Sequence, residues 1–335
     1  METETRAAVQ PNPPAGAHAE ALTAVIVSYH TGPALWTCLR SALADACIAH
    51  VVLVDNGNPG GVLARLRAMA SRQAKLTLLS GHGNVGFAAA CNLGAAVAKG
   101  DALLFLNPDL VLRRGAVQAL QRSLSHAEAR GPIVVGGRLL HPDGKEQRGA
   151  RRDHITPWSA FVAMSGLGRF ERWLPACRDP HREREPLPVG PQRVGAVSGA
   201  LLTVRRGDFA LLGGFDPGYF LHVEDLDLCR RAWEARGEVI FAPDAEGVHI
   251  GRTSRASGLF VERCKAQGFA RYFRRFAVGP AERVGAAVLG PVLGAALLTR
   301  GYLRDLPGRL SFDANAPAAS SWSRLRRRQA RRAPA

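Results

Sequence analysis

The stretch Leu22-Thr23-Ala24-Val25-Ile26-Val27-Ser28 opens the part of the chain that decides the fold. It is an apolar, β-branched run of the kind found in strands that are buried on both faces. Pro33 then opens a predicted helix to about Asp45, and a second strand is predicted over His50–Asp55. A strand, a helix and a strand of these lengths predict a βαβ unit with a parallel sheet.

The same alternation continues along the chain, with a helix predicted near 62–72, a strand at 75–80, a helix at 87–98 and a strand at 101–106. We therefore expect an α/β fold, with a mostly parallel central sheet flanked by helices. Such sheets bind ligands beyond the carboxyl ends of their strands. Asp55 and the group Asn107-Pro108-Asp109 both lie at strand ends of that kind.

Length and composition are those of a globular protein. A chain of 335 residues with 47% hydrophobic residues can form one large domain and an appendage. The six cysteines include no C-x-x-C pair, which favours a reducing compartment, so we expect a cytoplasmic protein. Residues 1–20 are rich in Pro and Ala, without a leader pattern, and are expected to be a disordered tail.

Positive charge is concentrated near the C-terminus. From Gly251 onward there are 17 Lys and Arg against 4 Asp and Glu, a balance of +13 out of the total of +16. Such a segment suits nucleic acid or an anionic membrane surface. A nucleic-acid reader would also carry exposed aromatic residues or a known motif, and neither is evident. We therefore expect no nucleic-acid partner and keep an anionic membrane surface as an expected one.

Three acidic residues, Glu224, Asp225 and Asp227, stand at the start of a predicted helix, just after the apolar-aromatic stretch 219–222. Acids are common at helix starts because the unpaired N–H groups there favour negative charge. A cluster of three beside aromatic residues also suits a general base at the rim of a pocket. Both interpretations stay open on these residues alone.

Gly81-His82-Gly83-Asn84-Val85-Gly86 spells G-x-G-x-x-G between a strand and a helix. That pattern is typical of dinucleotide binding, so a dinucleotide-dependent oxidoreductase is one possible function. The loop, however, follows the third predicted strand rather than the first. A turn that needs only the conformational freedom of glycine is the second interpretation.

Taken together, these segments resemble family 2 glycosyltransferases of the GT-A fold, especially the rhamnosyltransferase-like branch. The residues that carry the resemblance are Val25–His30, Val54–Asn56, Asn84–Phe87, Asn92–Gly94, Leu106–Asp109, Ser198–Leu201, Gly213–Asp216, Glu224–Arg230 and His249. Their order and spacing span about 230 residues, the region that we expect to be the GT-A domain, 21–250.

The resemblance implies a site for a nucleoside-diphosphate sugar. The donor-binding residues that it implies are Ser28, Tyr29, Asp55, Asn56, Asn84, Gly86, Asn92, Asn107 and Asp109. Asn107, Asp109 and His249 would hold a divalent metal, Mg²⁺ or Mn²⁺, although Asn107 departs from a strict D-x-D motif. Asp225 would be the catalytic base, with Glu224 as the second candidate, and Asp227 would serve structure.

The activity implied is an inverting, metal-dependent transfer of a sugar, with rhamnose the leading expectation. The donor would be dTDP-rhamnose or a UDP-sugar, and the acceptor a lipid-linked or oligosaccharide intermediate of a surface polysaccharide or lipopolysaccharide. Three competing interpretations are a turn at Asn107–Asp109, a structural role for His249, and a non-catalytic polysaccharide-binding relic of the fold. Hydrolysis by paired carboxylates is disfavoured because no motif places a second acid.

Two regions lie outside the regular alternation. Residues 151–193 show no clear period and are expected to be a variable insertion that could cover the acceptor. Residues 251–311 are expected to be a helical extension and 312–335 a basic disordered tail. Val284–Leu298 has no charge, but as a helix of about 22 Å, interrupted by Pro291, it falls short of the roughly 30 Å hydrocarbon core. It is therefore either a buried core helix or a helix in the membrane interface, peripheral on the inner face of the cell membrane.

Overall fold

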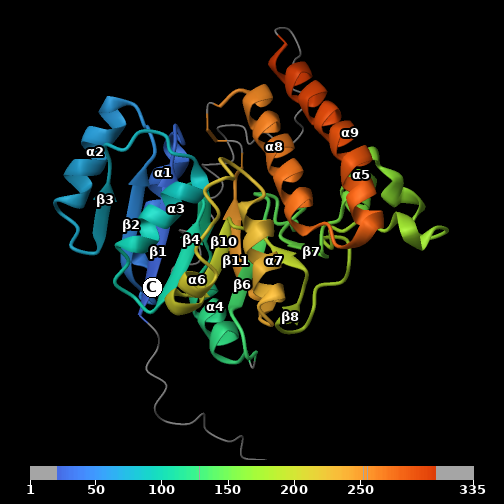
Figure 1. Ribbon diagram of the computed structural model, residues 1–335. Coiled ribbons are helices and arrows are strands. Elements are labelled where there is room, and N and C mark those ends of the chain that lie inside the picture. The colour runs from blue at the N-terminus through green and yellow to red at the C-terminus, as the bar shows by residue number, and fades with distance from the viewer. Residues whose placement is uncertain (1–20, 128, 252, 255, 307–335) are drawn as a thin grey trace, which may run out of the picture.

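A mixed nine-stranded sheet forms the centre of the molecule (Figure 1). The computed structural model describes residues 21–127, 129–251, 253–254 and 256–306, so the predicted tails at 1–20 and 312–335 lie outside the described residues. The strand order is β3-β2-β1-β4-β10-β6-β11-β5, with β8 paired to β11.

The first half of the sheet is parallel, as the sequence predicts. Its strands are β1 (Leu22–Ser28), β2 (Ile48–Asp55), β3 (Leu76–Leu79) and β4 (Ala102–Leu106). The connecting helices are α1 (Pro33–Ala44), α2 (Gly60–Ala70) and α3 (Phe87–Ala96). Ser28 pairs with Asp55 and Ile26 with Leu106, so the carboxyl ends of β1, β2 and β4 meet at one edge.

The second half mixes directions, because β10 lies antiparallel between β4 and β6. The strands here are β5 (Leu110–Leu112), β6 (Ile133–Leu140), β8 (Gln192–Arg193), β10 (Leu201–Arg205) and β11 (Glu238–His249). β11 is one continuous strand with a register shift between Ala242 and Glu246. This shift carries His249 to the same edge as Asn107.

Helices cover both faces of the sheet. Alternate residues of each central strand point to opposite sides, so Ile26 and Leu53 pack toward α1, α2 and α4 (Ala116–Ser125). Val27 and Val54 pack toward α3, α6 (Arg206–Leu211) and α7 (Glu224–Glu234). Both faces of the strands are thus buried, as their continuous apolar runs predict.

Residues 151–193, expected to be an insertion without a period, carry short ordered elements. These are β7 (Arg151–Arg152), α5 (Pro157–Ser165) and the 3₁₀ helices η1 (Leu167–Phe170) and η2 (Pro175–Cys177). β7 pairs with β9 (Ala196–Val197). The buried Arg151 side chain anchors the segment through Glu146, at 2.8 Å, and the carbonyl oxygen of Glu185, at 2.9 Å.

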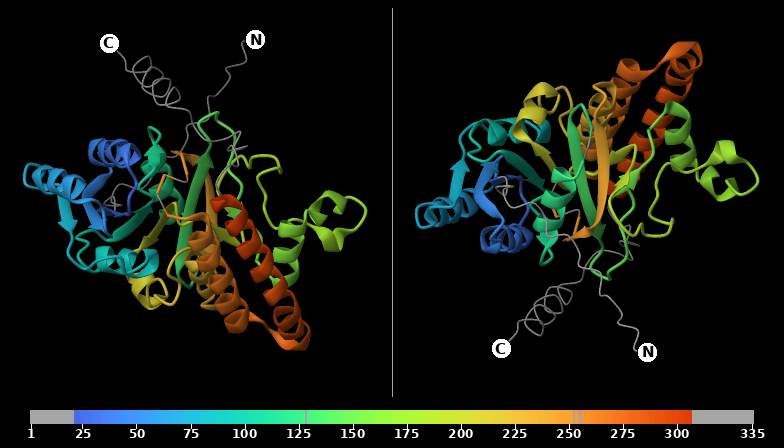
Figure 2. Two further views of the ribbon diagram at one scale, coloured as in Figure 1. Left: turned by 90° about the horizontal axis from the view of Figure 1, so that it is seen from above. Right: turned by 90° about the horizontal axis from the view of Figure 1, so that it is seen from below.

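Two long helices, α8 (Gly258–Phe276) and α9 (Gly279–Asp305), lie side by side beyond the sheet, with α5 next to α9 (Figure 2). Pro291 lies inside α9 and does not interrupt it, contrary to expectation. The core-helix interpretation of Val284–Leu298 is also wrong, because only 17% of the most apolar stretch of α9 is buried. By length and composition alone, α9 could cross a membrane.

Candidate active site

An open cleft of about 1940 Å³ lies over the carboxyl ends of the strands and extends to α5, α8 and α9. Tyr29, Asn56, Asn84, Gly86, Asn107, Asp109, Asp225 and His249 all line it, so most of the predicted site residues are brought together. Ser28, Asp55, Asn92 and Glu224 are not among its lining residues.

The loop 81–86 is fastened to the end of β2 by Asn56. The Asn56 amide donates to the Asn84 side chain at 2.9 Å and accepts from the backbone N–H of Val85 at 3.2 Å. Gly86 has φ 85°, and a Cβ there would lie 2.7 Å from the Phe220 carbonyl oxygen. The next residue, Phe87, donates its N–H to that same oxygen at 2.7 Å. Only a glycine at position 86 allows the loop to lie this close to Phe220, just before α7. This packing explains the last glycine of the G-x-G-x-x-G pattern without a bound dinucleotide.

Asp55 and Ser28 lie beneath the cleft and share Asn58 as a partner. The Asp55 Oδ1 atom accepts from both the backbone N–H and the side-chain amide of Asn58, at 2.9 and 2.7 Å. The same amide donates to the Ser28 hydroxyl oxygen at 2.9 Å. Asp55 therefore stabilises the turn after β2, while its donor-binding role stays a prediction.

Asn107, Asp109 and His249 meet where β4, β5 and β11 come together. The His249 Nε2 atom lies 3.1 Å from the Asn107 amide nitrogen and 3.2 Å from Asp109 Oδ1. Pairing of His249 with Leu110, and an N–H bond from Ile250 to the Asp109 carbonyl at 3.1 Å, hold these segments together. The three residues proposed for the metal are thus neighbours in space.

A second set of side chains orients these groups. Gln147 Oε1 lies 2.8 Å from His249 Nδ1 and accepts its proton, which directs the Nε2 atom toward Asp109 Oδ1 at 3.2 Å. A histidine oriented in this way through its other ring nitrogen is typical of metal sites. The Thr253 hydroxyl donates to Asp109 Oδ2 at 3.0 Å. Burial raises the pKa of Asp109, but the charge and hydrogen bonds of His249 and the bond from Thr253 outweigh it and lower the pKa below its usual value.

The donor set fits a hard or borderline divalent cation only in part. One carboxylate, one amide oxygen and one imidazole supply fewer than the six or so ligands that Mg²⁺ or Mn²⁺ takes. The described residues hold no cluster of three or more His, Cys, Asp or Glu side chains suited to a metal ion. A cation at this place would therefore complete its coordination with oxygens of a bound ligand or water.

Asp225 lies at the start of α7 and faces the cleft with its carboxylate held at both oxygens. Oδ2 accepts from Arg152 Nη2 at 2.8 Å and from the backbone N–H of Gly199 at 3.1 Å. Oδ1 accepts from the N–H of Leu226 at 2.8 Å. Both partners of the Arg152–Asp225 ion pair are largely buried. Oδ1 keeps a lone pair that no described side chain uses, so it is the atom free to accept a proton.

Glu224 is a poor second candidate for the base. Its carboxylate is buried away from the cleft, and Oε2 has no hydrogen-bond partner among the described residues. Burial first, and then the nearby charge of Asp225, raise its pKa to about 8. The expectation that Glu224 could replace Asp225 is therefore not supported by its position.

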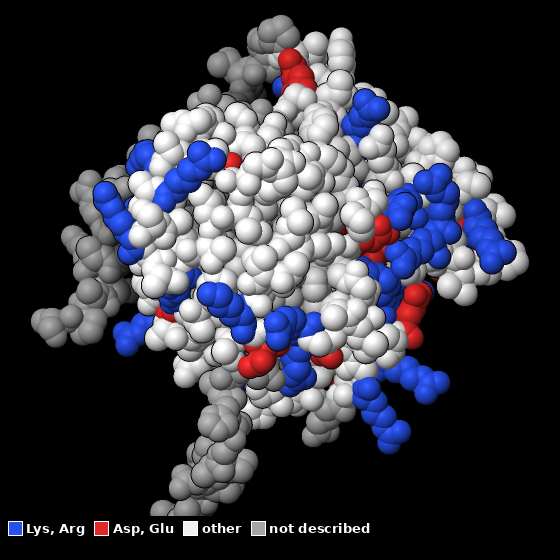
Figure 3. Space-filling view, turned by 60° about the vertical axis from the view of Figure 1, so that its left-hand side comes forward, with Lys and Arg blue, Asp and Glu red and all other residues white. Residues whose placement is uncertain are grey.

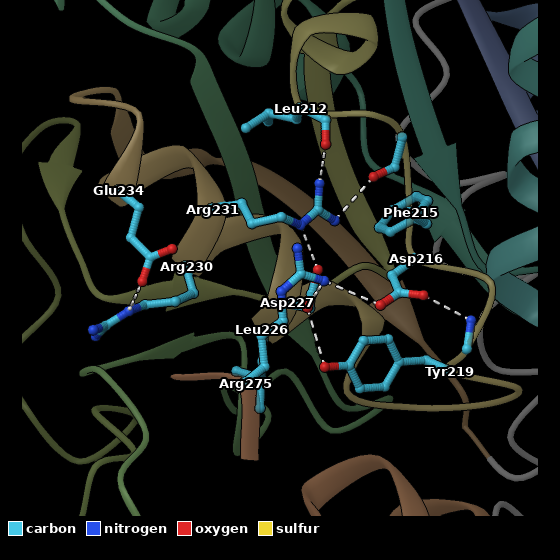
Figure 4. A network of polar contacts seen from close by, with 12 residues as sticks. Leu212, Phe215, Asp216, Tyr219, Leu226, Asp227, Arg230, Arg231, Glu234 and Arg275 are labelled. Carbon is cyan, nitrogen blue, oxygen red and sulfur yellow. Dashed lines mark hydrogen bonds and ion pairs between the residues drawn. The ribbon is translucent and has the colours of Figure 1, made fainter. Parts of the chain in front are cut away.

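Asp227 serves structure, as the sequence predicts. Its buried carboxylate contacts Arg231, accepts from the Tyr219 hydroxyl at 3.1 Å and pairs with Arg275 of α8 at 3.2 Å (Figure 4). Asn92, expected to bind the donor, is also structural. Its amide donates to the Phe215 carbonyl at 2.7 Å and accepts from the Phe215 N–H at 2.9 Å, so it ties α3 to the 213–216 turn.

Sequence reasoning missed Arg152 and Gln147. Arg152 is carried to Asp225 by the short β7–β9 pairing, and Gln147 bonds His249 across 102 residues. Neither residue lies in a motif with a fixed spacing to its partner. The one sequence signal for Arg152 is the adjacent pair Arg151-Arg152, in a segment that otherwise lacks a period.

Comparison with known proteins adds an independent line. Residues 23–186 match the family described as Glycosyl transferase family 2. N-acetylglucosaminyl-diphospho-decaprenol L-rhamnosyltransferase of Mycobacterium tuberculosis is 32% identical over 248 residues, which are 69% of this chain and 76% of that protein. Rhamnosyltransferase WbbL of Escherichia coli K12 is 25% identical, over 70% of this chain and 84% of its own length.

Solved structures share the fold at low sequence identity. A mannosyltransferase from Pyrobaculum calidifontis, in complex with GDP-Man and Mn²⁺, superposes with a TM-score of 0.53 at 16% identity, covering 94% of this chain and 81% of that one. GalNAc-T7, solved with UDP, GalNAc and Mn²⁺, gives 0.54 at 16% identity and covers 81% of this chain, which spans 54% of the GalNAc-T7 chain. These likenesses agree with the fold expected from the sequence.

Proposed function

The chain belongs to glycosyl transferase family 2, and from that premise we propose that it transfers rhamnose from a nucleoside-diphosphate donor to a lipid-linked acceptor. It is a glycosyltransferase, so the oxidoreductase and the non-catalytic relic are set aside. One observation carries the proposal: a single cleft is lined both by Asp109 and His249 and by Asp225, whose carboxylate is held in place by Arg152.

The donor would lie over the carboxyl ends of β1, β2 and β4. Tyr29 and Asn84 line this end of the cleft. Asp55, whose Oδ1 is taken by Asn58, would use its other oxygen to accept from a ring N–H of uracil or thymine. The diphosphate would extend toward Asn107 and Asp109. The leading donor is dTDP-rhamnose and the second a UDP-sugar, since the two rhamnosyltransferase relatives favour the first.

Asn107, Asp109 and His249 would hold the divalent metal, with diphosphate oxygens completing its coordination. Mn²⁺ suits the imidazole better than Mg²⁺ does. When bound, the metal would neutralise negative charge that develops on the leaving diphosphate. Gln147 would keep the His249 lone pair aimed at that position, and Thr253 would keep Asp109 ionised and oriented.

The chemical step would be a single displacement with inversion at the anomeric carbon. Asp225 Oδ1 accepts the proton of the acceptor hydroxyl while that oxygen attacks the donor. Arg152 and the Gly199 N–H hold Oδ2, so the carboxylate is positioned before the acceptor arrives. One base is enough for such a step, which agrees with the position of Glu224 away from the cleft.

The acceptor would enter from the α5, α8 and α9 end of the cleft. The relative from Mycobacterium tuberculosis is named for a diphospho-decaprenol acceptor, so we propose a saccharide on a lipid diphosphate that serves a cell-surface polymer. The protein would then work in the cytoplasm, peripherally on the inner face of the cell membrane.

Donor binding and transfer test this proposal in one series. The purified protein is titrated calorimetrically with dTDP-rhamnose, UDP-sugars and GDP-mannose, with Mn²⁺ and then with excess EDTA. The true donor should bind only with the metal, and Asp109→Ala should remove that difference. Product formation on a GlcNAc-diphospholipid acceptor is then followed by mass spectrometry, and the anomeric configuration by NMR. Equal donor affinity with and without EDTA would sink the metal assignment, and a retained configuration would sink single displacement.

A further inference from the structure

One face of α9 is exposed and free of charge over about five helical turns. Residues spaced three or four apart on a helix share a face, and the large apolar ones on this face are well exposed. They are Val284 (63%), Val288 (60%), Val292 (49%), Leu298 (39%) and Tyr302 (58%). Ala287, Pro291, Ala295 and Thr299 complete this α9 stripe and are exposed as well. The stripe is about 27 Å long from its first residue to its last.

A second apolar surface stands beside it. The segment 157–177, here termed the α5 lobe, exposes Trp158 (44%), Trp173 (72%) and Leu174 (57%). Gly285 of α9 approaches Pro157 of α5 within van der Waals contact of an added Cβ, at 3.7 Å. Both views in Figure 2 place the lobe next to α9. The two surfaces are therefore neighbours although they lie more than a hundred residues apart in sequence.

The cleft ends between these surfaces. At this end its lining includes the apolar residues Ala160 and Met164 from α5 and Ala296 and Leu297 from α9, together with charged residues of α8 and α9, namely Lys265, Arg300, Arg304 and Asp305. Its polar reaction centre is thus connected, within one continuous space, to the seam between the two exposed apolar elements.

Arginines outnumber acids at the margins of these surfaces, where Glu171, Glu282 and Asp305 also lie. Arg283 lies at the start of the stripe, Arg300 and Arg304 near its end, and the exposed Arg169 and Arg172 adjoin Trp173. Lys and Arg also predominate over Asp and Glu on the face shown in Figure 3, which is turned toward the side of α2 and β3 rather than toward the stripe. Exposed tryptophan and arginines around an apolar surface are typical of proteins that lie at a lipid–water interface.

From these observations we propose that the α9 stripe and the α5 lobe together bind the surface of an anionic bilayer, with the seam between them directed at the lipid. The part that concerns the acceptor rests on the proposed function: a lipid-linked acceptor would pass from the bilayer into the cleft without leaving the membrane surface. The helix lies on the bilayer rather than across it, because Arg300 and Arg304 hold it to α8 through the buried Glu262, at 2.6 Å each.

A second copy of this chain fits the stripe less well. A two-fold dimer would pair two α9 helices either antiparallel, which sets Arg283 of each near Arg300 and Arg304 of the other, or parallel, which sets each arginine near its own copy. Both arrangements bring arginines together. Anionic lipid head groups, by contrast, attract Arg283 at one end of the stripe, and at the other end Arg300 and Arg304, which are partly exposed and whose two charges share the single carboxylate of Glu262.

Co-sedimentation of the full chain with vesicles tests the surface without any acceptor. The vesicles are phosphatidylcholine alone or with phosphatidylglycerol. Trp173→Asp, and separately Val288→Asp with Val292→Asp, should each weaken binding to the anionic vesicles at least about tenfold, because a carboxylate replaces buried apolar area. Leu211→Asp is the matched control: Leu211 is 73% exposed, like Trp173, but lies on α6. It should bind as the unchanged protein does.

Brominated lipids supply the second readout. They should quench the tryptophan fluorescence of the unchanged protein, and Trp173→Phe should remove most of that quenching. Unchanged vesicle binding in both the lobe and the stripe variants would overturn the proposal. So would a dimer, seen by sedimentation, that the stripe variants dissociate while vesicle binding is absent.

Transfer assays separate this proposal from the proposed function. The stripe variants should transfer to a water-soluble acceptor at the normal rate and lose activity on a vesicle-embedded one. Vesicle binding that is intact in a protein with no transferase activity would overturn the proposed function alone. Equal loss on both acceptors would overturn the role of this surface in acceptor delivery.

Discussion

At Asp225 the two carboxylate oxygens have unlike surroundings, and this difference suits the residue to the proposed role of base. Oδ2 takes two strong donors, one of them charged, while Oδ1 takes only the backbone N–H of the next residue, Leu226. A carboxylate held in this way loses little freedom when the acceptor hydroxyl arrives. The acid that sequence reasoning favours is therefore well placed, whereas its neighbour Glu224 is buried beside it.

Replacement of Asp225 by Asn should lower kcat by about 10²–10⁴-fold and leave donor affinity nearly unchanged. The amide keeps the shape of the side chain but cannot accept a proton. Steady-state transfer rates and donor calorimetry on the same preparation measure both quantities. Near-native turnover in Asp225→Asn would place the base elsewhere.

Arg152 acts through Asp225, so Arg152→Ala should lower kcat by about 10²-fold with little change in donor KM. Guanidinium ion added at millimolar concentration should restore part of the rate, and Arg152→Lys should be intermediate. Arg182→Ala is the control, because the Arg182 side chain is as buried (15% against 14% exposed) but pairs with Glu185. An equal fall in kcat in Arg152→Ala and Arg182→Ala, or no recovery of the rate with guanidinium ion, would mean that Arg152 has only a structural role.

The site residues differ in how far sequence could place them. Asn107, Asp109 and His249 follow strand ends, and parallel strands bring such ends to one edge, so their meeting was predictable. Asn92 lies outside the lining of the cleft because its amide faces Phe215, and a motif gives identity and order but not the direction of an amide. Arg152 could not be predicted, since a two-residue strand pairing over more than forty residues leaves no period.

At the scale of elements, α7 carries two ion pairs of the same spacing in opposite environments (Figure 4). Asp227 and Arg231 are four residues apart and buried, whereas Arg230 and Glu234 are four apart and partly exposed. The buried pair also reaches α8 through Arg275, which joins α7, the helix of the proposed base, to the C-terminal helices.

Asp227→Ala should therefore lower the free energy of unfolding by about 3–5 kcal/mol, because it leaves Arg231 buried without its carboxylate. Glu234→Ala should cost about 0.5 kcal/mol or less. Urea unfolding of the two variants and the unchanged protein compares them directly. A similar small cost for both would mean that solvent reaches Asp227.

Elements with a period were predictable, and those without one were not. β1 has the predicted bounds because its apolar run is continuous, and α1 begins at the predicted Pro33. Pro291 predicts an interruption of α9, yet it lies on the exposed face, where water can bond the carbonyl that proline leaves free. The sheet is mixed because β10 inserts between β4 and β6. Pairing between strands far apart in the sequence cannot be predicted from the local residue pattern.

At the scale of the whole molecule, charge and apolar surface are arranged together. The balance of +13 from Gly251 onward and the uncharged α9 stripe belong to the same quarter of the chain. Attraction between charges is screened by salt, while apolar burial is not.

Binding to anionic vesicles should accordingly fall steeply between about 0.05 and 0.5 M NaCl, as the Debye length shrinks from roughly 14 Å to 4 Å. A residual fraction should remain bound at high salt and should disappear in Val288→Asp with Val292→Asp. Co-sedimentation across the series measures both parts. Complete release of the unchanged protein at high salt would show that the α9 stripe does not contribute to vesicle binding. Binding that does not change with salt would show that the arginines do not contribute.

The contact between Gly86 and Phe220 has a consequence for how the two substrates influence each other. The loop 81–86 is joined to the segment that leads into α7 by a hydrogen bond of 2.7 Å from the Phe87 N–H to the Phe220 carbonyl oxygen. There is no room for a side chain at Gly86 between them. Any displacement of the loop when the nucleotide binds must therefore be felt at the entrance to α7. Thermodynamic reciprocity then requires that the acceptor alter the affinity for the nucleotide by the same factor. Gly86, which looks like part of a cofactor fingerprint, would then be the point at which the two proposed binding equilibria are coupled.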